Sequence, residues 1–410
     1  MKRISVKLIC LAFFLAILCP SLLSCGKKAA KSNTLYVYNW GEYISDGSEG
    51  TYDTNAEFEK WYFETYGEKV NVVYSTYSSN EDMYAKITGG AVNYDVIIPS
   101  DYMIERLIEE DQLLPLNYDN IPNAKNISPD FMGENAYYDK GNVYSVPYFY
   151  GMIGIIYNTS MVDEADLHLD ENGLGSWDIM WSEKYKGNIL QFNNSRDAFG
   201  TAQYKLGIDV NTNDESQWRV ALEELKKQKN IVQGYVMDEI FNKMEGGSAA
   251  IAAYYAGDFL AMYDNNEDLD FFYPKNTNLY VDAMCIPKSA QNKELAEAYI
   301  NFMCGKEAAV ANAVYTYYAS PNLLVRDDPE YIDELGDFAL EKLYGTEGVN
   351  ATPYKNLSGK DLALINNLWE ELKSDIDVSP TIYILCISIV SALIFFALFF
   401  VIRKRIRNSY

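Results

Sequence analysis

Aromatic and carboxylate side chains recur together just after the predicted strands of this 410-residue chain. An aromatic ring face attracts a cation by about 0.5 to 2 kcal/mol, and a carboxylate neutralises an ammonium group that is costly to bury alone. This pairing suits a flexible amine whose charged groups are separated by methylene spacers. The segments are 39–43, 99–102, 193–197, 255–258, 280–282 and 318–322.

Other chemistries have less support in the sequence. A net charge of −24 excludes nucleic acid as an expected partner, because phosphate binding needs a basic face. The single histidine, His168, lies in an acidic run that reads as a solvated loop, so no two-histidine zinc site can form. No phosphate-binding GxxxxGK[ST] motif is present. We therefore expect no enzymatic activity, no cofactor and no metal.

Three alternatives remain open. The tyrosine pairs 254–255 and 317–318 are a possible set of hard oxygen ligands for ferric iron. Aromatic side chains also stack on sugars, although the excess of carboxylates favours a cation. A glycoside hydrolase would need two carboxylates that converge on one point, whereas a polyamine receptor would spread them along an elongated cleft.

The elements that must position these residues form two α/β runs. Strands are predicted at 35–38, 70–74 and 94–98, with helices at 55–66, 79–87 and 102–110 between and after them. The pattern restarts with strands at 188–192, 231–236 and 248–254 and with helices at 195–206, 215–229 and 238–245. Two such runs indicate two lobes, and ligands of open α/β sheets bind at the carboxyl ends of strands.

Both ends of the chain carry targeting signals. Residues 1–25 have a basic start, a short apolar stretch and the ending Leu22-Leu-Ser-Cys25, which is typical of a bacterial lipoprotein signal with Cys25 as the lipidated residue. Residues 26–33 read as a linker. Residues 381–402 lack charge and are long enough to span a bilayer, and the basic tail 403–410 predicts a cytoplasmic end.

Charge and cysteine distribution agree with export of the middle segment. Without the seven basic residues of the two ends, 27 basic residues face 58 acidic residues, a net charge of −31. Cys285 and Cys304 are the two cysteines between the end segments, and they are either disulfide-bonded or buried free thiols.

Several motifs together resemble the bacterial spermidine/putrescine-binding proteins, the substrate-binding components of polyamine ABC transporters. The resemblance covers residues 34 to about 375, and the first two motifs are the most specific. The motifs are YNWGEY (38–43), YSTYSSNEDMYAK (74–86), YDVIIPS (94–100), VPY (146–148), YVDAMCIP (280–287) and SPNL (320–323).

The resemblance implies a set of ligand contacts, carried over position by position. Tyr255 and Tyr280 replace tryptophans that sandwich the methylene chain, Asp197 replaces a glutamate, and Asn194 stands where a relative has an aspartate. Asp101 and Asp258 are nearby acids that either replace that missing carboxylate or are solvated. The matching positions are Trp40, Glu42, Tyr43, Ser100, Tyr102, Asn194, Asp197, Tyr255, Tyr280, Asp282 and Tyr318.

The fold implied by this resemblance is an α/β, two-lobed, type II periplasmic-binding-protein-like fold with the ligand cleft between lobes, to which we add the C-terminal transmembrane helix. Lobe 1 is expected to comprise 34–143 with 280–318, and lobe 2 to comprise 144–279 with 319–375. The expected partners are spermidine or putrescine, a permease with its ATPase, and the membrane. We expect a monomer in the cell membrane, with its binding domain on the extracytoplasmic face.

Overall fold

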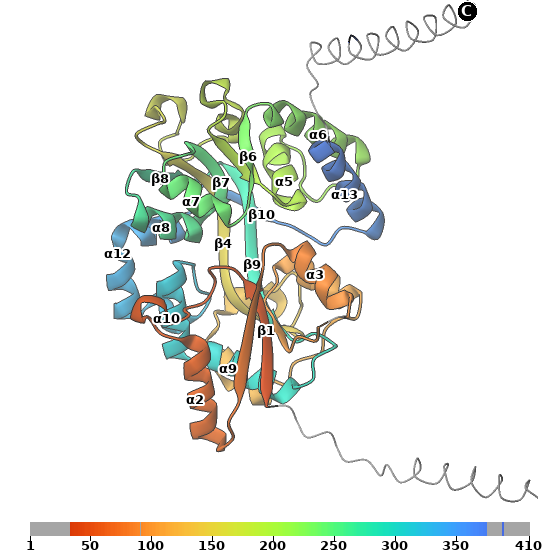
Figure 1. Cartoon of the computed structure of the whole chain (residues 1–410), viewed down its shortest axis with the longest axis vertical. Coiled ribbons are helices and arrows are strands. Elements are labelled where there is room, and N and C mark those ends of the chain that lie inside the picture. Colours follow the sequence, from red (N-terminus) through yellow and green to blue (C-terminus); the bar gives the residue numbers. More distant parts are fainter. Residues whose placement is uncertain (1–32, 91, 375–387, 389–410) are drawn as a thin grey trace, which may run out of the picture. The chain divides into compact units, whose positions relative to one another are not determined.

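The computed structural model describes residues 33–90, 92–374 and 388. The chain divides into two compact units (Figure 1). Among the described residues, unit 1 comprises 33–151 and 280–343, and unit 2 comprises 152–279 and 344–374. Strands β4 and β9 each begin in one unit and end in the other.

Unit 1 is built on a mixed sheet in the order β2-β1-β3-β9. Strand β1 pairs in parallel with β2 and β3, and Ile97 of β3 pairs antiparallel with Cys285 of β9. The strands are β1 (Thr34–Trp40), β2 (Asn71–Tyr77), β3 (Val96–Ile97) and β9 (Asn276–Cys285). The helices are α2 (Thr54–Tyr66), α3 (Asn80–Thr88), α4 (Asp101–Glu109), α9 (Lys293–Met303), α10 (Lys306–Thr316), α11 (Leu323–Arg326) and α12 (Pro329–Tyr344).

Local signals explain where the first helices begin and end. The Asp53 carboxylate accepts a hydrogen bond from the backbone N–H of Ala56 at 2.9 Å and so caps α2, which ends at Gly67 in a left-handed conformation (φ 72°). The Ser79 hydroxyl caps α3 in the same way, through the N–H of Asp82 at 3.1 Å. Both caps lie where the sequence predicts a helix boundary.

The strands of unit 2 also pair in both parallel and antiparallel senses. Strand β4 pairs antiparallel with β7 and β8, whereas β5 pairs in parallel with β6 and β7, and β10 pairs in parallel with the first residues of β9. The strands are β4 (Ser145–Asn158), β5 (Ile189–Phe192), β6 (Val232–Val236), β7 (Ile251–Tyr255), β8 (Leu269–Phe272) and β10 (Asn350–Pro353). The helices are α5 (Ser195–Leu206), α6 (Glu215–Lys229), α7 (Glu239–Glu245), α8 (Ala256–Asn265) and α13 (Gly359–Ser374).

The limits of unit 1 extend beyond those expected for lobe 1, which ended at residues 143 and 318. The backbone N–H of Tyr150 in β4 donates to the carbonyl of Ala319 at 3.0 Å, so both segments belong to the same packed body. Helices α11 and α12 then continue unit 1 to Leu343.

The predicted fold included a transmembrane helix at 381–402, and this part of the prediction is corrected. No helix in the described part of the chain is long and apolar enough to cross a membrane. The last helix there, α13, has 16 residues and carries charged side chains such as Lys360, Glu371 and Lys373 along its length. Residues 381–402 lie outside the described residues, except for Ser388.

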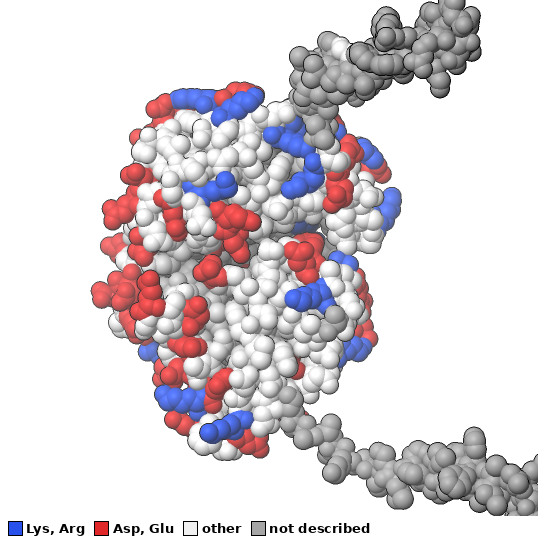
Figure 2. Space-filling view, in the orientation of Figure 1, with Lys and Arg blue, Asp and Glu red and all other residues white. Residues whose placement is uncertain are grey.

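Acidic side chains are spread over the visible face of each unit (Figure 2), as the composition of the middle segment leads us to expect. The hydrophobic cores lie beneath this surface. Unit 1 packs Tyr38, Met83, Ile97 and Leu107 against Val281 and Cys285 of β9. Unit 2 packs α5, α6 and α13 around Phe199, Trp218, Leu225, Ile365 and Leu368.

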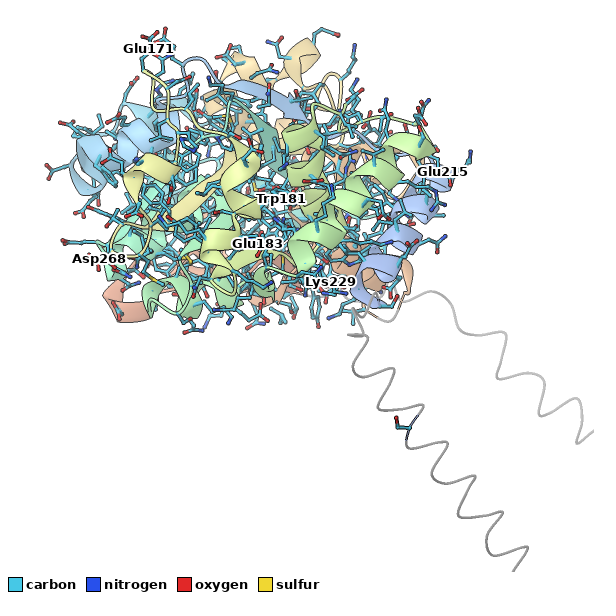
Figure 3. The ribbon with its side chains drawn as sticks, turned by 90° about the horizontal axis from the view of Figure 1, so that it is seen from above. Glu171, Trp181, Glu183, Glu215, Lys229 and Asp268 are labelled. Carbon is cyan, nitrogen blue, oxygen red and sulfur yellow. The ribbon has the colours of Figure 1, made fainter. Side chains whose placement is uncertain are left out.

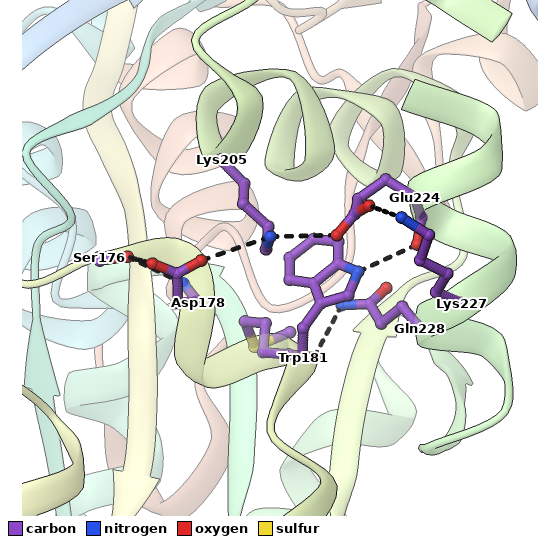
Figure 4. Close-up of polar contacts among 8 residues, drawn as sticks. Ser176, Asp178, Trp181, Lys205, Glu224, Lys227 and Gln228 are labelled. Atoms are coloured by element: carbon purple, nitrogen blue, oxygen red, sulfur yellow. Dashed lines mark hydrogen bonds and ion pairs between the residues drawn. The ribbon is translucent and has the colours of Figure 1, made fainter. Parts of the chain in front are cut away.

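A partly buried polar network fastens α5 and α6 to the short 3₁₀ helix Trp177–Trp181. Figure 3 shows Trp181 near α6, which runs from Glu215 to Lys229. The indole N–H of Trp181 donates to the carbonyl of Glu224 at 3.0 Å. Figure 4 shows the ammonium group of Lys205 between Glu224 (3.0 Å) and Asp178 (3.3 Å). Because only 10% of the Glu224 side chain is exposed, this ion pair is poorly screened by water.

We predict that Glu224→Ala lowers the free energy of unfolding by about 1 to 3 kcal/mol, because Lys205 and Lys227 lose a hydrogen-bonded carboxylate. Urea unfolding at neutral pH measures the loss. The neighbouring Glu223→Ala is the matched control: its side chain is 66% exposed, so its effect should stay within about 0.5 kcal/mol. Equal losses in the two variants would show that the network adds nothing to stability.

Candidate functional site

Asp282 is the central carboxylate of unit 1. It lies within β9, is 4% exposed, and accepts a hydrogen bond from the hydroxyl of Tyr43 at 2.6 Å. Ser100 pairs with Asp282 through an isolated β-bridge, so the loop after β3 lies against this part of β9. Three predicted ligand residues, Tyr43, Ser100 and Asp282, are therefore brought together.

The Tyr43 hydroxyl remains a proton donor in this setting. Burial, followed by the negative charge of Asp282, raises the pKa of Tyr43 well above its ordinary value of 10.0. The phenol therefore does not ionise near neutral pH and continues to donate to the carboxylate. This hydrogen bond holds one oxygen of Asp282 in place without neutralising its charge.

Aromatic rings surround Tyr43. The ring of Tyr318 lies edge-on to it at a centroid distance of 4.6 Å, and the rings of Phe149 and Tyr148 lie at 5.3 and 5.6 Å. The hydroxyl of Tyr148 donates to the carbonyl of Tyr43 at 3.0 Å and fixes the backbone after β1. Tyr318 follows Tyr317, which ends α10 in the left-handed conformation (φ 59°). A carboxylate and an aromatic cluster thus share one part of unit 1.

Tyr280 lies two residues before Asp282 on β9, so both side chains project from the same face of the strand. Tyr280 is 5% exposed, and its hydroxyl lies against Gly151, where an added Cβ atom would be 2.5 Å away. The phenol therefore depends on a glycine to reach this position. The predicted pair of Tyr280 and Asp282 is held on a single rigid element.

Trp40 is fixed by its indole N–H, which donates to the carbonyl of Ile98 at 3.0 Å. The hydroxyl of Tyr77 donates to the same carbonyl at 2.7 Å, and the two rings are 4.6 Å apart. Glu42, by contrast, is exposed and has a left-handed backbone (φ 48°).

Asp101 is a second buried carboxylate of unit 1, only 1% exposed. It accepts hydrogen bonds from the hydroxyl of Tyr137 and, at 2.7 Å, from the backbone N–H of Tyr102. Burial raises the pKa of Asp101 to about 8, and the charge of Asp282 contributes in the same direction. The alternative that Asp101 is a solvated surface acid is therefore wrong.

Side chains of α3 hold the start of α4, which carries Asp101, in place. The amide of Asn80 accepts from the N–H of Ser100 at 3.2 Å and donates to the hydroxyl of Tyr102 at 3.1 Å. Tyr102 also donates to Glu81 at 3.1 Å, so its hydroxyl is engaged by α3. The specific motif at 74–86 thus serves, in this structure, to position the loop 100–102.

Unit 2 contains a third buried carboxylate, Asp197, in the first turn of α5. The hydroxyl of Tyr255 donates to it at 2.7 Å and the amide of Asn194 at 2.8 Å. Burial raises the pKa of Asp197, whereas the hydrogen bonds from Tyr255 and Asn194 lower it. Three predicted residues of unit 2 are therefore in contact.

Asn194 has a local role that explains why it differs from the expected aspartate. Its side-chain oxygen caps α5 by accepting from the N–H of Asp197 at 2.8 Å, while its NH₂ group donates to the Asp197 carboxylate. An ionised aspartate could cap the helix but has no N–H to donate. The amide therefore caps α5 and also supports the neighbouring carboxylate of Asp197.

Sequence reasoning missed the aromatic partners of these acids. Tyr137 binds Asp101, and Tyr354 donates a hydrogen bond that lowers the pKa of Asp197. Neither tyrosine follows a predicted strand within the segments that the pattern singles out. With 35 tyrosines in the chain, residue type alone does not distinguish these two.

The remaining predicted features concern thiols and metals. Cys285 and Cys304 are free and buried, which settles the alternative in favour of free thiols. Within residues 33–90, 92–374 and 388, no cluster of three or more His, Cys, Asp or Glu side chains could hold a metal ion. Cys25 lies outside the described residues.

Known proteins are similar to this chain in sequence and in fold. The family model for bacterial extracellular solute-binding proteins matches residues 55–336. The spermidine/putrescine-binding periplasmic protein of Escherichia coli (strain K12) is 30% identical over 368 residues, which cover 87% of this chain and 97% of that protein.

Two solved structures are similar over nearly their whole length. One, described as a spermidine/putrescine ABC transporter of Listeria monocytogenes, has a TM-score of 0.72 and 33% identity, and the match covers 84% of this chain and 99% of that one. The substrate-binding protein PotD of Streptococcus pneumoniae has a TM-score of 0.65 and 34% identity, with 83% and 99% covered. The chain therefore belongs to the bacterial extracellular solute-binding proteins.

Proposed function

We propose that this protein captures a polyamine, spermidine or putrescine, outside the cytoplasm and delivers it to the permease and ATPase of an ABC transporter. The observation that carries the proposal is the hydrogen-bonded carboxylate beside aromatic rings, which occurs in both units. Asp282 has Tyr43 and its aromatic neighbours, and Asp197 has Tyr255. The names of the relatives at about 30% identity support the same ligand class.

The chemistry of these groups suits an ammonium ion. A buried carboxylate compensates the desolvation of a bound cation, and tyrosine ring faces attract that cation and cover its methylene groups. The phenolic donors orient the carboxylates but leave their negative charge available. A phosphate or carboxylate ligand would be repelled by the same groups.

We further propose that the protein acts as a monomer that is tethered to the membrane through lipidated Cys25. The support is the sequence at 22–25 together with the extracellular family. A linker of eight residues would join Cys25 to the folded part, which begins close to β1. The proposed binding groups lie wholly within the two units.

The proposed function predicts ligand binding by the full chain, measured by titration calorimetry with spermidine and with putrescine. Asp282→Asn should weaken binding at least about thirtyfold, because the bound ammonium loses its buried countercharge. Asp111→Asn makes the same charge change in unit 1 at a side chain that is 81% exposed, and should bind like the wild type. Absence of polyamine binding by the wild type would refute the proposed function, and normal binding by Asp282→Asn would refute the site.

The second prediction concerns pH. Asp101 has a pKa of about 8, raised by burial and by the charge of Asp282, so a cation bound at Asp282 should favour loss of its proton. Affinity should therefore increase as pH rises from 6 to 8, and binding at pH 7 should release protons. Calorimetry in buffers of different ionisation enthalpy counts these protons. Asp101→Asn should reduce proton release, Asp111→Asn should not, and an unchanged value in Asp101→Asn would contradict the coupling.

The third prediction concerns the anchor. Cys25→Ala should abolish the lipid modification, because it removes the thiol to which the proposed lipid would be attached. Mass spectrometry of the N-terminal peptide and fractionation of cells measure the outcome. Ser24→Ala, which keeps a small residue before the cysteine, is the control and should remain lipidated. An unmodified Cys25 in the wild type would contradict the proposal.

A further inference from the structure

Tyr354 is a buried residue of unit 2 that directly follows β10. It is 3% exposed. The segment is tied to α5 and to the loop after it: the hydroxyl of Tyr204 donates to the carbonyl of Thr352 at 3.1 Å, and the amide of Asn211 donates to the carbonyl of Pro353 at 2.9 Å. These hydrogen bonds place the phenol of Tyr354 next to α5.

The hydroxyl of Tyr354 lies directly over Gly200 in the middle of α5. A Cβ atom at residue 200 would be 2.0 Å from this oxygen, a distance that no structure tolerates without movement. Glycine inside a helix costs about 0.5 to 1 kcal/mol relative to alanine. In this helix, the glycine makes room for a phenolic hydroxyl on the surface of α5.

Gly200 and Asp197 are three residues apart and so lie on the same side of α5, about one turn from each other. The phenol that rests on Gly200 therefore also reaches the carboxylate. A hydrogen bond from Tyr354 is among the contributions that lower the pKa of Asp197. It adds to the hydrogen bonds from Tyr255 and Asn194 already described.

Arg196 holds the ring of Tyr354 from another direction. Its guanidinium carbon is 4.4 Å from the centroid of that ring. The guanidinium is fixed by the carbonyl of Val210 at 2.9 Å and by the side chain of Asn211 at 2.9 Å. Arg196 is 4% exposed, so its positive charge also acts on Asp197 through a poorly solvated interior.

We propose that Tyr354 is a positioning residue of the ligand site: seated on Gly200 and held by Arg196, it orients Asp197 toward the bound amine. This inference rests on the proposed function and extends it to a residue outside the predicted ligand set. Tyr354 acts through Asp197 and needs no contact with the ligand.

The groups that act on Asp197 come from several elements. Arg196 lies beside it on α5, Tyr255 lies at the end of β7, and Tyr354 follows β10. Burial, followed by the negative charges of acids that include Asp258 and Asp197, raises the pKa of Tyr254 on β7 well above 10.0. Tyr254 therefore stays neutral. Replacing Tyr354 with phenylalanine removes its hydroxyl and alters no formal charge.

The test compares Tyr354→Phe and Gly200→Ala with the wild-type full chain. Both should weaken spermidine binding about tenfold at pH 7, as expected for loss of one hydrogen bond to a charged group. The pH at which affinity is half-maximal should rise in both variants, because a carboxyl with fewer donors has a higher pKa. Tyr204→Phe removes a hydroxyl between the same two elements, and its affinity should stay within about twofold of the wild type.

The outcomes separate the inference from the proposed function. Wild-type affinity and an unchanged pH profile in Tyr354→Phe would overturn the positioning role. Equal weakening of binding by Tyr204→Phe would also overturn it, because the effect would then reflect the general stability of this part of unit 2. Wild-type protein that binds no polyamine would overturn the proposed function instead. In that case, carboxyl NMR of Asp197 in the wild type and in Tyr354→Phe still tests the inference, with an unchanged pKa refuting it.

Discussion

Burial of carboxylates is the physical constraint on which the rest of this structure depends. A carboxylate removed from water is costly unless hydrogen bonds or opposite charges compensate it. Asp101, Asp197 and Asp282 are each less than 10% exposed, and each receives a hydrogen bond from a tyrosine hydroxyl. A neutral donor relieves part of this cost, and burial still raises the pKa of Asp101 to about 8. The abundance of tyrosine in this chain serves, in part, to meet this requirement.

The scaffold supplies these donors from elements that are distant in sequence. In unit 1, the strand β9 carries Asp282 while the loop after β1 carries Tyr43. In unit 2, the first turn of α5 carries Asp197, and the positive end of the helix dipole favours a negative charge at that point. The two units thus reach similar chemistry by different local structures, a strand in one and a helix terminus in the other.

Much of this could be read from the sequence, for identifiable reasons. Helix boundaries were predictable at Ser79 and Gly67, because side-chain caps and left-handed glycines are local signals. The contacts of Tyr43 with Asp282, and of Asn194 and Tyr255 with Asp197, join residues that the segments after the predicted strands and the family resemblance single out. Whether these groups bind a ligand is a separate matter that the binding experiments address.

The rest depended on tertiary contacts that leave no local signal. The hydroxyl of Tyr354 reaches Asp197 only because Gly200 leaves room for it, and no sequence pattern near residue 354 indicates this contact. The high pKa of Asp101 follows from burial, which the sequence beside it does not reveal. The transmembrane helix was inferred from an uncharged run and the basic tail that follows it, and the described structure contains no helix of that kind.

Strand β9 also limits how the gene can vary in length. Its first residues, from Asn276 to Leu279, pair with β10, and its end at Cys285 pairs with β3. Side chains alternate between the two faces of a strand, so one codon inserted or deleted between those anchors would turn Asp282 to the opposite face. Residues 160–174, between the hydrogen bonds of Thr159 to Asp268 and of Gly175 to Tyr273, form no strand and have no such register to keep. We therefore expect insertions and deletions among relatives to occur in that segment and not in β9.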